Sequence, residues 1–187
     1  MPALADSLVI TDAETRALAA LRDASGESDG VMERHCVRCF LLCEKLAERE
    51  GRELDREVTL CAALLHDIGV YPSVTHGGVY TEEGAEVARE LGLAAGWDER
   101  RAALCADACA YHHSVRPKRE YGFEVEAMRL ADRIEVSGAL FKSGLTREQI
   151  REVNSAAPRH GFYAGLLQVV WPLVRTRPRT LPSVFNP

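Results

Sequence analysis

A histidine and an aspartate stand next to each other at the end of an apolar run, in the motif Leu-Leu-His-Asp-Ile-Gly at residues 64–69. A charged group in apolar surroundings is costly unless it is paired or holds a metal ion. Successive helix residues point about 100° apart, so His66 and Asp67 share one site only near a helix end. Gly69 and Pro72 indicate such an end. These residues alone support a metal-binding pair and a capped helix whose histidine merely satisfies a neighbour about equally.

Other imidazoles and carboxylates fall at inward or terminal positions of further predicted helices. His35 lies on the apolar side of a helix predicted over residues 31–50, and His112 and His113 end another helix. Asp132 lies on the apolar stripe of a third helix, where a carboxylate needs an arginine or a metal as its cation. Each of these residues alone could be structural. For His35 taken singly, a core histidine bonded to a carbonyl is the commoner case.

Together these groups form a mixed set of nitrogen and oxygen donors on separate helices. Such a set suits a divalent transition metal, namely manganese, iron, zinc, nickel or cobalt, better than calcium or magnesium. Four protein ligands of this kind leave positions open for water and substrate, as catalytic sites require. The combination therefore favours metal binding more strongly than any single residue does.

The elements that must position these groups are all predicted to be helices. Capping boxes begin helices at Thr11 and Thr146, and Asp55 caps the helix that carries the His-Asp pair. No strand pattern, internal repeat or low-complexity linker interrupts them. We therefore predict an all-α, single compact helical domain of about 7–8 helices, with helices at about 11–24, 31–50, from 55 to the His-Asp pair, 81–92, 99–113, 123–140, from 147, and 158–176.

A chain of 187 residues is long enough for one domain with a full core. We assign residues 1–187 to that domain, with C-terminal helices over 141–176 and an extended tail over 177–187. The tail holds three prolines and is predicted to lie on a partner subunit, which makes a homodimer a fair expectation. In the last helix we expect an inward face made of Tyr163, Leu166, Leu167, Val170 and Leu173.

The composition excludes several classes of protein. Hydrophobic residues make up 47% and charged residues 27%, the balance of an ordinary globular domain. A net charge of −5 and a pI near 5.7 argue against a general nucleic-acid binder. No apolar run approaches the roughly 20 residues of a membrane span, and the first residues show no signal-peptide pattern. We expect a cytoplasmic protein.

The six cysteines have no zinc-finger spacing. Cys36, Cys39 and Cys43 form one stripe of a helix, Cys105 and Cys109 are one turn apart, and Cys61 stands alone. Free cysteine behaves as a small buried hydrophobe. We predict that all six pack in the core, in a reducing compartment.

The order of these groups resembles the HD-domain superfamily of metal-dependent phosphohydrolases. His35, then the His66-Asp67 pair, then Asp132 fit the pattern of that superfamily in order and spacing over about residues 31–140. The resemblance implies an all-α fold and a core metal ion held by these four residues. It also implies hydrolysis of a phosphate ester.

Two departures restrict what the resemblance implies. The HD-GYP phosphodiesterases have a lysine after the His-Asp-Ile-Gly run, and the deoxynucleotide monophosphatases a glutamate three residues after the Asp. Here Val70 occupies that position, so neither specific activity is carried over. Dinuclear members add two histidines. His112 or His113 is suited to one of these roles, whereas Thr81 stands where the other is usual, so His76 would have to reach in from its loop.

The leading hypothesis is a hydrolase that acts on a small phosphorylated substrate, either a phosphate ester or a nucleotide, through a metal-activated water. Asp67 would bridge the ion and the water and take the proton. The anionic substrate would be held by basic residues near the site, for which solvated surface charge is the alternative: Arg34, Arg116, Lys118 and Arg119.

Two rival functions belong to other classes. One is a dinuclear-iron oxygenase of the same superfamily, which requires a second metal site completed by His76 or another residue. The other is a metal-stabilised binding or regulatory module without turnover, in which the metal has no open coordination position.

Overall fold

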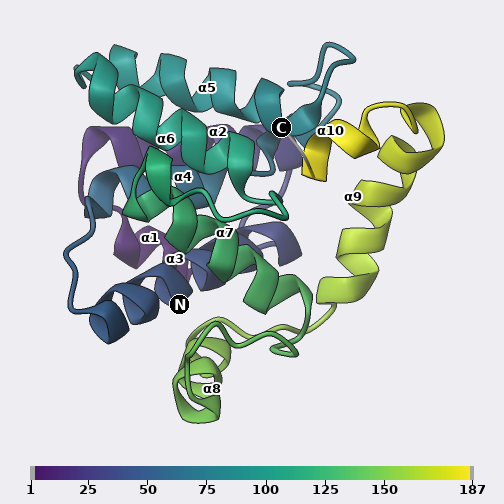
Figure 1. The fold of residues 1–187 in the computed structure, drawn as a ribbon. Coiled ribbons are helices and arrows are strands. Elements are labelled where there is room, and N and C mark those ends of the chain that lie inside the picture. The colour runs from purple at the N-terminus through teal and green to yellow at the C-terminus, as the bar shows by residue number, and fades with distance from the viewer. Residues whose placement is uncertain (1–2, 186–187) are drawn as a thin grey trace.

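The computed structural model describes residues 3–185, and this part of the chain is helical without a single strand (Figure 1). The all-α prediction is confirmed. Eight long helices match the expected seven or eight, and two five-residue helices are added near the ends. The elements are α1 (Leu4–Leu8), α2 (Asp12–Ser25), α3 (Val31–Glu50), α4 (Arg56–Leu65), the 3₁₀ turn η1 (Ile68–Val70), α5 (Tyr80–Ala94), α6 (Glu99–Tyr111), the 3₁₀ turn η2 (Arg119–Tyr121), α7 (Phe123–Val136), α8 (Arg147–Ala156), α9 (Phe162–Thr176) and α10 (Leu181–Phe185).

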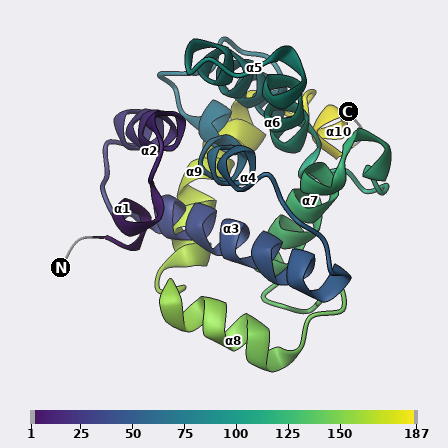
Figure 2. The same cartoon turned by 90° about the vertical axis from the view of Figure 1, so that its left-hand side faces the viewer.

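Helix α3 lies at the centre of the molecule and contacts α1, α4, α7, α8 and α9 (Figure 2). It is central because most of its length is buried, including the stripe of Cys36, Cys39 and Cys43. Gly51 ends it in the left-handed conformation, with φ 62°, where its N–H bonds back to the last turn. All six cysteines are buried and free, as predicted, so the stripe serves as core packing.

Helix α4 ends in the core, so that His66 and Asp67, which directly follow it, are buried. The Asp55 carboxylate caps its first turn by accepting from the Val58 N–H, and every residue from Val58 to Leu65 is buried. Gly69 is needed for close approach rather than for an unusual φ, because a Cβ there would lie 2.1 Å from the Tyr80 carbonyl oxygen. The turn after the pair is thereby packed directly on the start of α5.

Helices α5 and α6 form an antiparallel pair against α4, and α7 lies between α6 and α3. Asp98 caps α6, which ends at Tyr111 and places His112 and His113 at its C-terminal end. The middle of α7 carries Asp132. The ends of α4 and α6 therefore meet the sides of α3 and α7.

The C-terminal helices differ from the sequence prediction. Helix α7 ends at Val136 instead of about residue 140, because Gly138 and Ala139 both adopt positive φ. The expected inward face of α9 is wrong for Tyr163 and Leu167, which are 52% and 66% exposed. The reason is that α9 is buried only near its two ends, where its residues Phe162 and Leu173 pack on the rest of the chain.

The described part of the tail is not extended. Residues 181–185 form α10, because Val184 finds a buried place against Tyr80 and Leu173 of the same chain. The tail thus covers its own domain, and the basis for predicting a homodimer is lost, although the oligomeric state itself stays a prediction. Residues 186–187 lie outside the described chain. Within residues 3–185, no helix combines the length and the hydropathy that a bilayer crossing requires.

Candidate metal centre

Two histidines at helix ends present the same nitrogen to the core. The Nδ1 of His66 lies 2.8 Å from the Ala63 carbonyl oxygen, and the Nδ1 of His112 lies 2.6 Å from the Cys109 carbonyl oxygen. A carbonyl can only accept, so both Nδ1 atoms carry the proton. These carbonyls are among the last of their helices, which lack an intrahelical N–H partner. Each Nε2 therefore carries a lone pair that is free for a metal ion.

His35 approaches from the side of α3 and is fully buried. Its Nε2 lies 3.1 Å from the Nε2 of His66, and its Nδ1 faces the Oε1 of Glu135 at 3.6 Å. The ring of Phe162 stacks on it, with centroids 5.1 Å apart and planes at 21°. Packing on one face and a carboxylate at Nδ1 thus direct Nε2 toward His66.

The carboxylates of Asp67 and Asp132 complete the cluster. Asp67 Oδ2 lies 3.3 Å from His66 Nε2 and 3.6 Å from His35 Nε2, and Oδ1 lies 3.4 Å from His112 Nε2. Asp132 Oδ1 lies 3.6 Å from His35 Nε2, and its Oδ2 lies 3.0 Å from His113 Nδ1. Six residues from four segments of the chain therefore form one cluster.

The donor set fits a metal ion on two observations. The Nε2 atoms of His35 and His66 face each other at 3.1 Å, a contact that needs a proton or a metal ion between the two nitrogens. Two nitrogen or oxygen donors about 2.1 Å from one ion are themselves about 3.0–3.4 Å apart, close to the spacings of this cluster. In addition, His112 Nε2 and Asp132 Oδ1 are buried without a hydrogen-bond partner within the described chain.

The electrostatics also favour a cation. Burial acts to lower the pKa of His66, but the Asp67 carboxylate raises it well above its ordinary value. Burial acts to raise the pKa of Asp132, but His113 and its neighbours hold it at about 2, so this carboxylate stays ionised. Burial and the adjacent His113 lower the pKa of His112 to about 4, which leaves its imidazole neutral at pH 7.

Three overlapping groups have donor atoms within 4.8 Å of one another: His35, Cys39, His66 and Asp132; His66, Asp67 and His112; and His112, His113 and Asp132. Because His66, His112 and Asp132 each belong to two of these groups, the donor atoms could hold one ion or two neighbouring ions. His76 belongs to none of these groups. Its side chain is exposed, and its backbone N–H bonds to Glu83 at 2.6 Å, so the structure does not bring it to the cluster.

A cavity of about 180 Å³ borders the cluster at His112 and His113, and its other lining residues are Ser114, Val115, Arg129 and Arg133. None of the four basic residues that the sequence indicated lines it. Arg34 pairs with Asp29 at 3.6 Å, and Lys118 lies over the ring of Tyr111 at 4.2 Å.

Arg119 and Arg116, the other two predicted substrate-binding residues, do not line the cavity either. Arg119 pairs with Glu50 at 3.5 Å, at the end of α3 and about 22 Å along the helix from His35. Arg116 is exposed, and its carbonyl accepts from the Ser114 hydroxyl at 3.1 Å.

Sequence reasoning missed Arg133 and Glu135. Arg133 is the exposed cation of the cavity, and its guanidinium lies over the Phe141 ring at 4.3 Å. It follows Asp132 directly, which is the signal that could have found it. Glu135 lies three residues after Asp132, so both project from one face of α7. Arg129, also in the cavity, is already paired with Glu126 at 2.8 Å.

Comparison with protein families gives one result. The model of the HD domain matches residues 32–137, which hold every donor atom of the cluster and end just after α7. No curated protein matches the chain.

Proposed function

The chain belongs to the HD-domain family, and from that premise we propose that it is a metal-dependent phosphohydrolase acting on a small phosphate ester. The superfamily consists mostly of metal-dependent hydrolases. The observation that carries the proposal is the facing pair of Nε2 atoms of His35 and His66, flanked by the carboxylates of Asp67 and Asp132.

His35, His66, Asp67 and Asp132 are the proposed ligands. An ion bound there supplies a coordinated water of lowered pKa and neutralises charge on a phosphoryl oxygen. The orientation of the imidazoles comes from the chain itself, because the Ala63 carbonyl accepts from His66 Nδ1 at 2.8 Å and the Glu135 carboxylate faces His35 Nδ1 at 3.6 Å.

Asp67 is the proposed proton acceptor. Burial acts to raise its pKa, but the imidazoles of His66, His112 and His35 hold it well below its ordinary value, so the carboxylate is ionised at neutral pH. Its Oδ1 faces the unprotonated Nε2 of His112 at 3.4 Å. A proton accepted at Oδ1 therefore has a second basic atom beside it.

Arg133 is the proposed anchor for the phosphate group, in preference to Lys118 and Arg119. It lines the same cavity as His112 and His113, and no ion pair within the described chain neutralises it. Arg116 remains a second proposed anchor in the exposed loop after Ser114. A cavity of about 180 Å³ is smaller than the usual 300–1,000 Å³ of small-molecule sites, which favours a small phosphate monoester.

The test is metal analysis combined with a screen of phosphate esters. Protein purified without added metal or chelator, and kept from oxygen, is expected to hold about one divalent ion per chain and to hydrolyse at least one small phosphate monoester. The His66→Ala variant is expected to lose both while it keeps its helical circular-dichroism signal. Retained metal in that variant would refute the ligand assignment, and a metal-loaded protein without turnover would refute the hydrolase.

A second candidate, a dinuclear-iron oxygenase, is favoured by one observation. His112 and His113 form a further donor group with Asp132, so a second ion does not depend on His76. Two irons per chain, with oxygen consumed in the presence of a substrate, would support this function over hydrolysis. A single ion without an open coordination position would instead support a binding module.

A further inference from the structure

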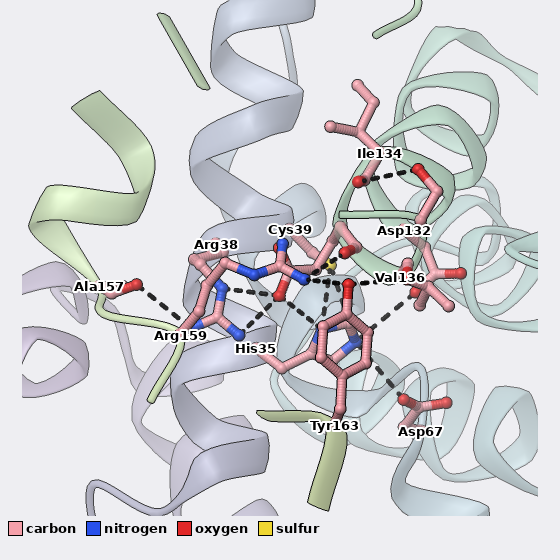
Figure 3. A network of polar contacts seen from close by, with 12 residues as sticks. His35, Arg38, Cys39, Asp67, Asp132, Ile134, Val136, Ala157, Arg159 and Tyr163 are labelled. Carbon is pink, nitrogen blue, oxygen red and sulfur yellow. Dashed lines mark hydrogen bonds and ion pairs between the residues drawn. The ribbon is translucent and has the colours of Figure 1, made fainter. Parts of the chain in front are cut away.

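A buried network connects His35 to residues that follow the HD-domain match (Figure 3). Glu135 is 1% exposed, so its ionised carboxylate needs partners. Arg38 supplies Nε and Nη2 to Oε1 at 2.7 and 2.6 Å. Arg159 supplies Nη1 to Oε2 at 2.6 Å and Nη2 to the Glu135 backbone oxygen at 2.8 Å. Two guanidinium groups thus hold both carboxylate oxygens.

Arg159 belongs to the turn between α8 and α9, which contacts both Arg38 and the ring of His35. Arg38 Nη1 donates to the carbonyls of Ala157 and Pro158 at 3.2 and 3.1 Å. The ring of Phe162 lies under both guanidiniums, at 5.3 Å from Arg38 and 5.1 Å from Arg159, and stacks on His35. The segment 157–162 therefore contacts every member of the network.

The two arginines have different effects on the carboxylate. Arg38 binds Oε1, the same oxygen that faces His35 Nδ1, so it competes with the imidazole for that atom. Arg159 binds the opposite oxygen and the backbone of the same residue, which fixes the plane of the carboxylate. With that plane fixed, Oε1 stays directed at Nδ1 at 3.6 Å, where its negative charge favours the tautomer protonated at Nδ1.

We propose that Arg159 is a positioning residue of the metal centre, which acts through Glu135 to hold His35 with its Nδ1 protonated and its Nε2 lone pair directed at the ion. The proposal rests on the proposed metal site, but it does not depend on which reaction follows. Outer carboxylates that hold a ligating histidine typically change metal affinity by about 10–100-fold when they are removed. The proposal thus gives the segment 157–162, which lies outside the HD-domain match, a role in the metal site.

The test is a double-mutant cycle on Zn²⁺ affinity, measured by competition with a chromophoric chelator in folded protein. Glu135→Gln is expected to weaken binding by about 10–100-fold, and Arg159→Gln by about tenfold. Because Arg159 acts through Glu135, Arg159→Gln in the Glu135→Gln background is expected to add less than twofold. An equal tenfold loss in both backgrounds would overturn the proposal.

Two control variants separate positioning from general stability. Tyr163→Phe removes a hydroxyl that accepts from Arg159 Nη2 at 3.1 Å. Arg101→Gln removes a comparable ion-pair network, with Asp55 and Glu57, in another part of the molecule. Both are expected to leave Zn²⁺ affinity within twofold, whatever they do to urea unfolding.

If Arg159→Gln does not fold, Arg159→Lys provides the measurement. It keeps the charge but not the two-pronged geometry, and is expected to weaken Zn²⁺ binding by several fold; unchanged affinity would overturn the proposal. A wild-type protein that binds no Zn²⁺ would refute the metal site itself. If the wild-type protein binds Zn²⁺ but Arg159→Gln leaves the affinity unchanged, only the role of Arg159 is refuted.

Discussion

The C-terminal ends of helices and the second turn of α3 orient a histidine in different ways. At the ends of α4 and α6, His66 and His112 donate Nδ1–H to a carbonyl three residues back on their own helix. His35 lies in the second turn of α3, where the preceding carbonyls accept from the N–H groups of the helix, so its Nδ1 relies on Glu135 from α7. Orientation at a helix end is therefore local, whereas orientation within a helix needs long-range contacts.

The pH dependence of metal binding would show this difference with the largest effect. Burial acts to lower the pKa of both His35 and His66. Cys39, Asp67 and Glu135 raise the pKa of His35, and Asp67 raises that of His66, so that both lie well above the ordinary value. Protons therefore occupy these imidazoles at a pH where free histidine is mostly neutral, and a metal ion must displace them. Affinity is expected to fall as the pH falls, by about 10–100-fold per unit, in chelator competition between pH 8 and pH 6.

The Glu135→Gln variant would show how much of this pH dependence comes from His35 and how much from His66. Loss of the carboxylate removes one of the groups that raise the pKa of His35, but it leaves the Asp67 carboxylate beside His66. The pH dependence of metal affinity is expected to become shallower near neutrality, as the His35 proton leaves at lower pH. If the wild-type and Glu135→Gln proteins showed the same pH dependence, Glu135 would not act on His35 in the way proposed.

The same difference explains what could be predicted from the sequence. The inward position of His35 and the place of His66 and Asp67 at the end of α4 could be predicted, because helical periodicity and a helix-end glycine are local signals. Glu135 reaches Arg38 and Arg159 across 97 and 24 residues, and no local pattern encodes such contacts.

Outside the HD-domain match the sequence was less informative. Helix α9 is apolar on most of its surface, so hydrophobic periodicity could not show which side is buried. The packing of α10 against Tyr80 depends on how the chain returns to α5, and a segment with several prolines carries no signal for it. The basic loop was chosen by its nearness to His112 in sequence, whereas the cavity cation comes from α7.

Gly69→Ala would break the helix-end region by overpacking. A Cβ at this position would lie 2.1 Å from the Tyr80 backbone oxygen, and backbone cannot move aside as a flexible side chain does. The free energy of unfolding in urea is expected to fall by about 3 kcal/mol, with partial loss of metal because the turn carries Asp67. Gly78→Ala is the control, since its nearest contact is a Glu83 side-chain atom at 3.4 Å, and a comparable loss there would contradict the packing argument.

Arg133→Ala would test the proposed phosphate anchor on α7, and it leaves intact both the helix-end carbonyls and Glu135, which orient the histidines. Removing a charge-assisted contact to a phosphate group is expected to raise KM about tenfold while metal content stays unchanged, because no ligand is altered. Steady-state kinetics on the ester found in the screen would measure it. Lys118→Ala is the matched control, expected to stay within twofold because its ammonium lies 4.2 Å over the Tyr111 ring; the reverse ranking would return the anchor to the basic loop.

Cys39 would have the smallest effect, although it is the thiol closest to the cluster. Its Sγ lies 3.9 Å from Nδ1 and 3.8 Å from Nε2 of His35. A sulfur at equal distance from both ring nitrogens lies off the axis of the Nε2 lone pair, so it is badly placed to share an ion with that atom. The double variant Cys36→Ala, Cys39→Ala is therefore expected to keep its metal content and turnover, with a free energy of unfolding lowered by about 1–2 kcal/mol from lost packing. If elemental analysis showed that this variant loses its metal, Cys39 would be a ligand, and the orientation of His35 would depend on its own helix after all.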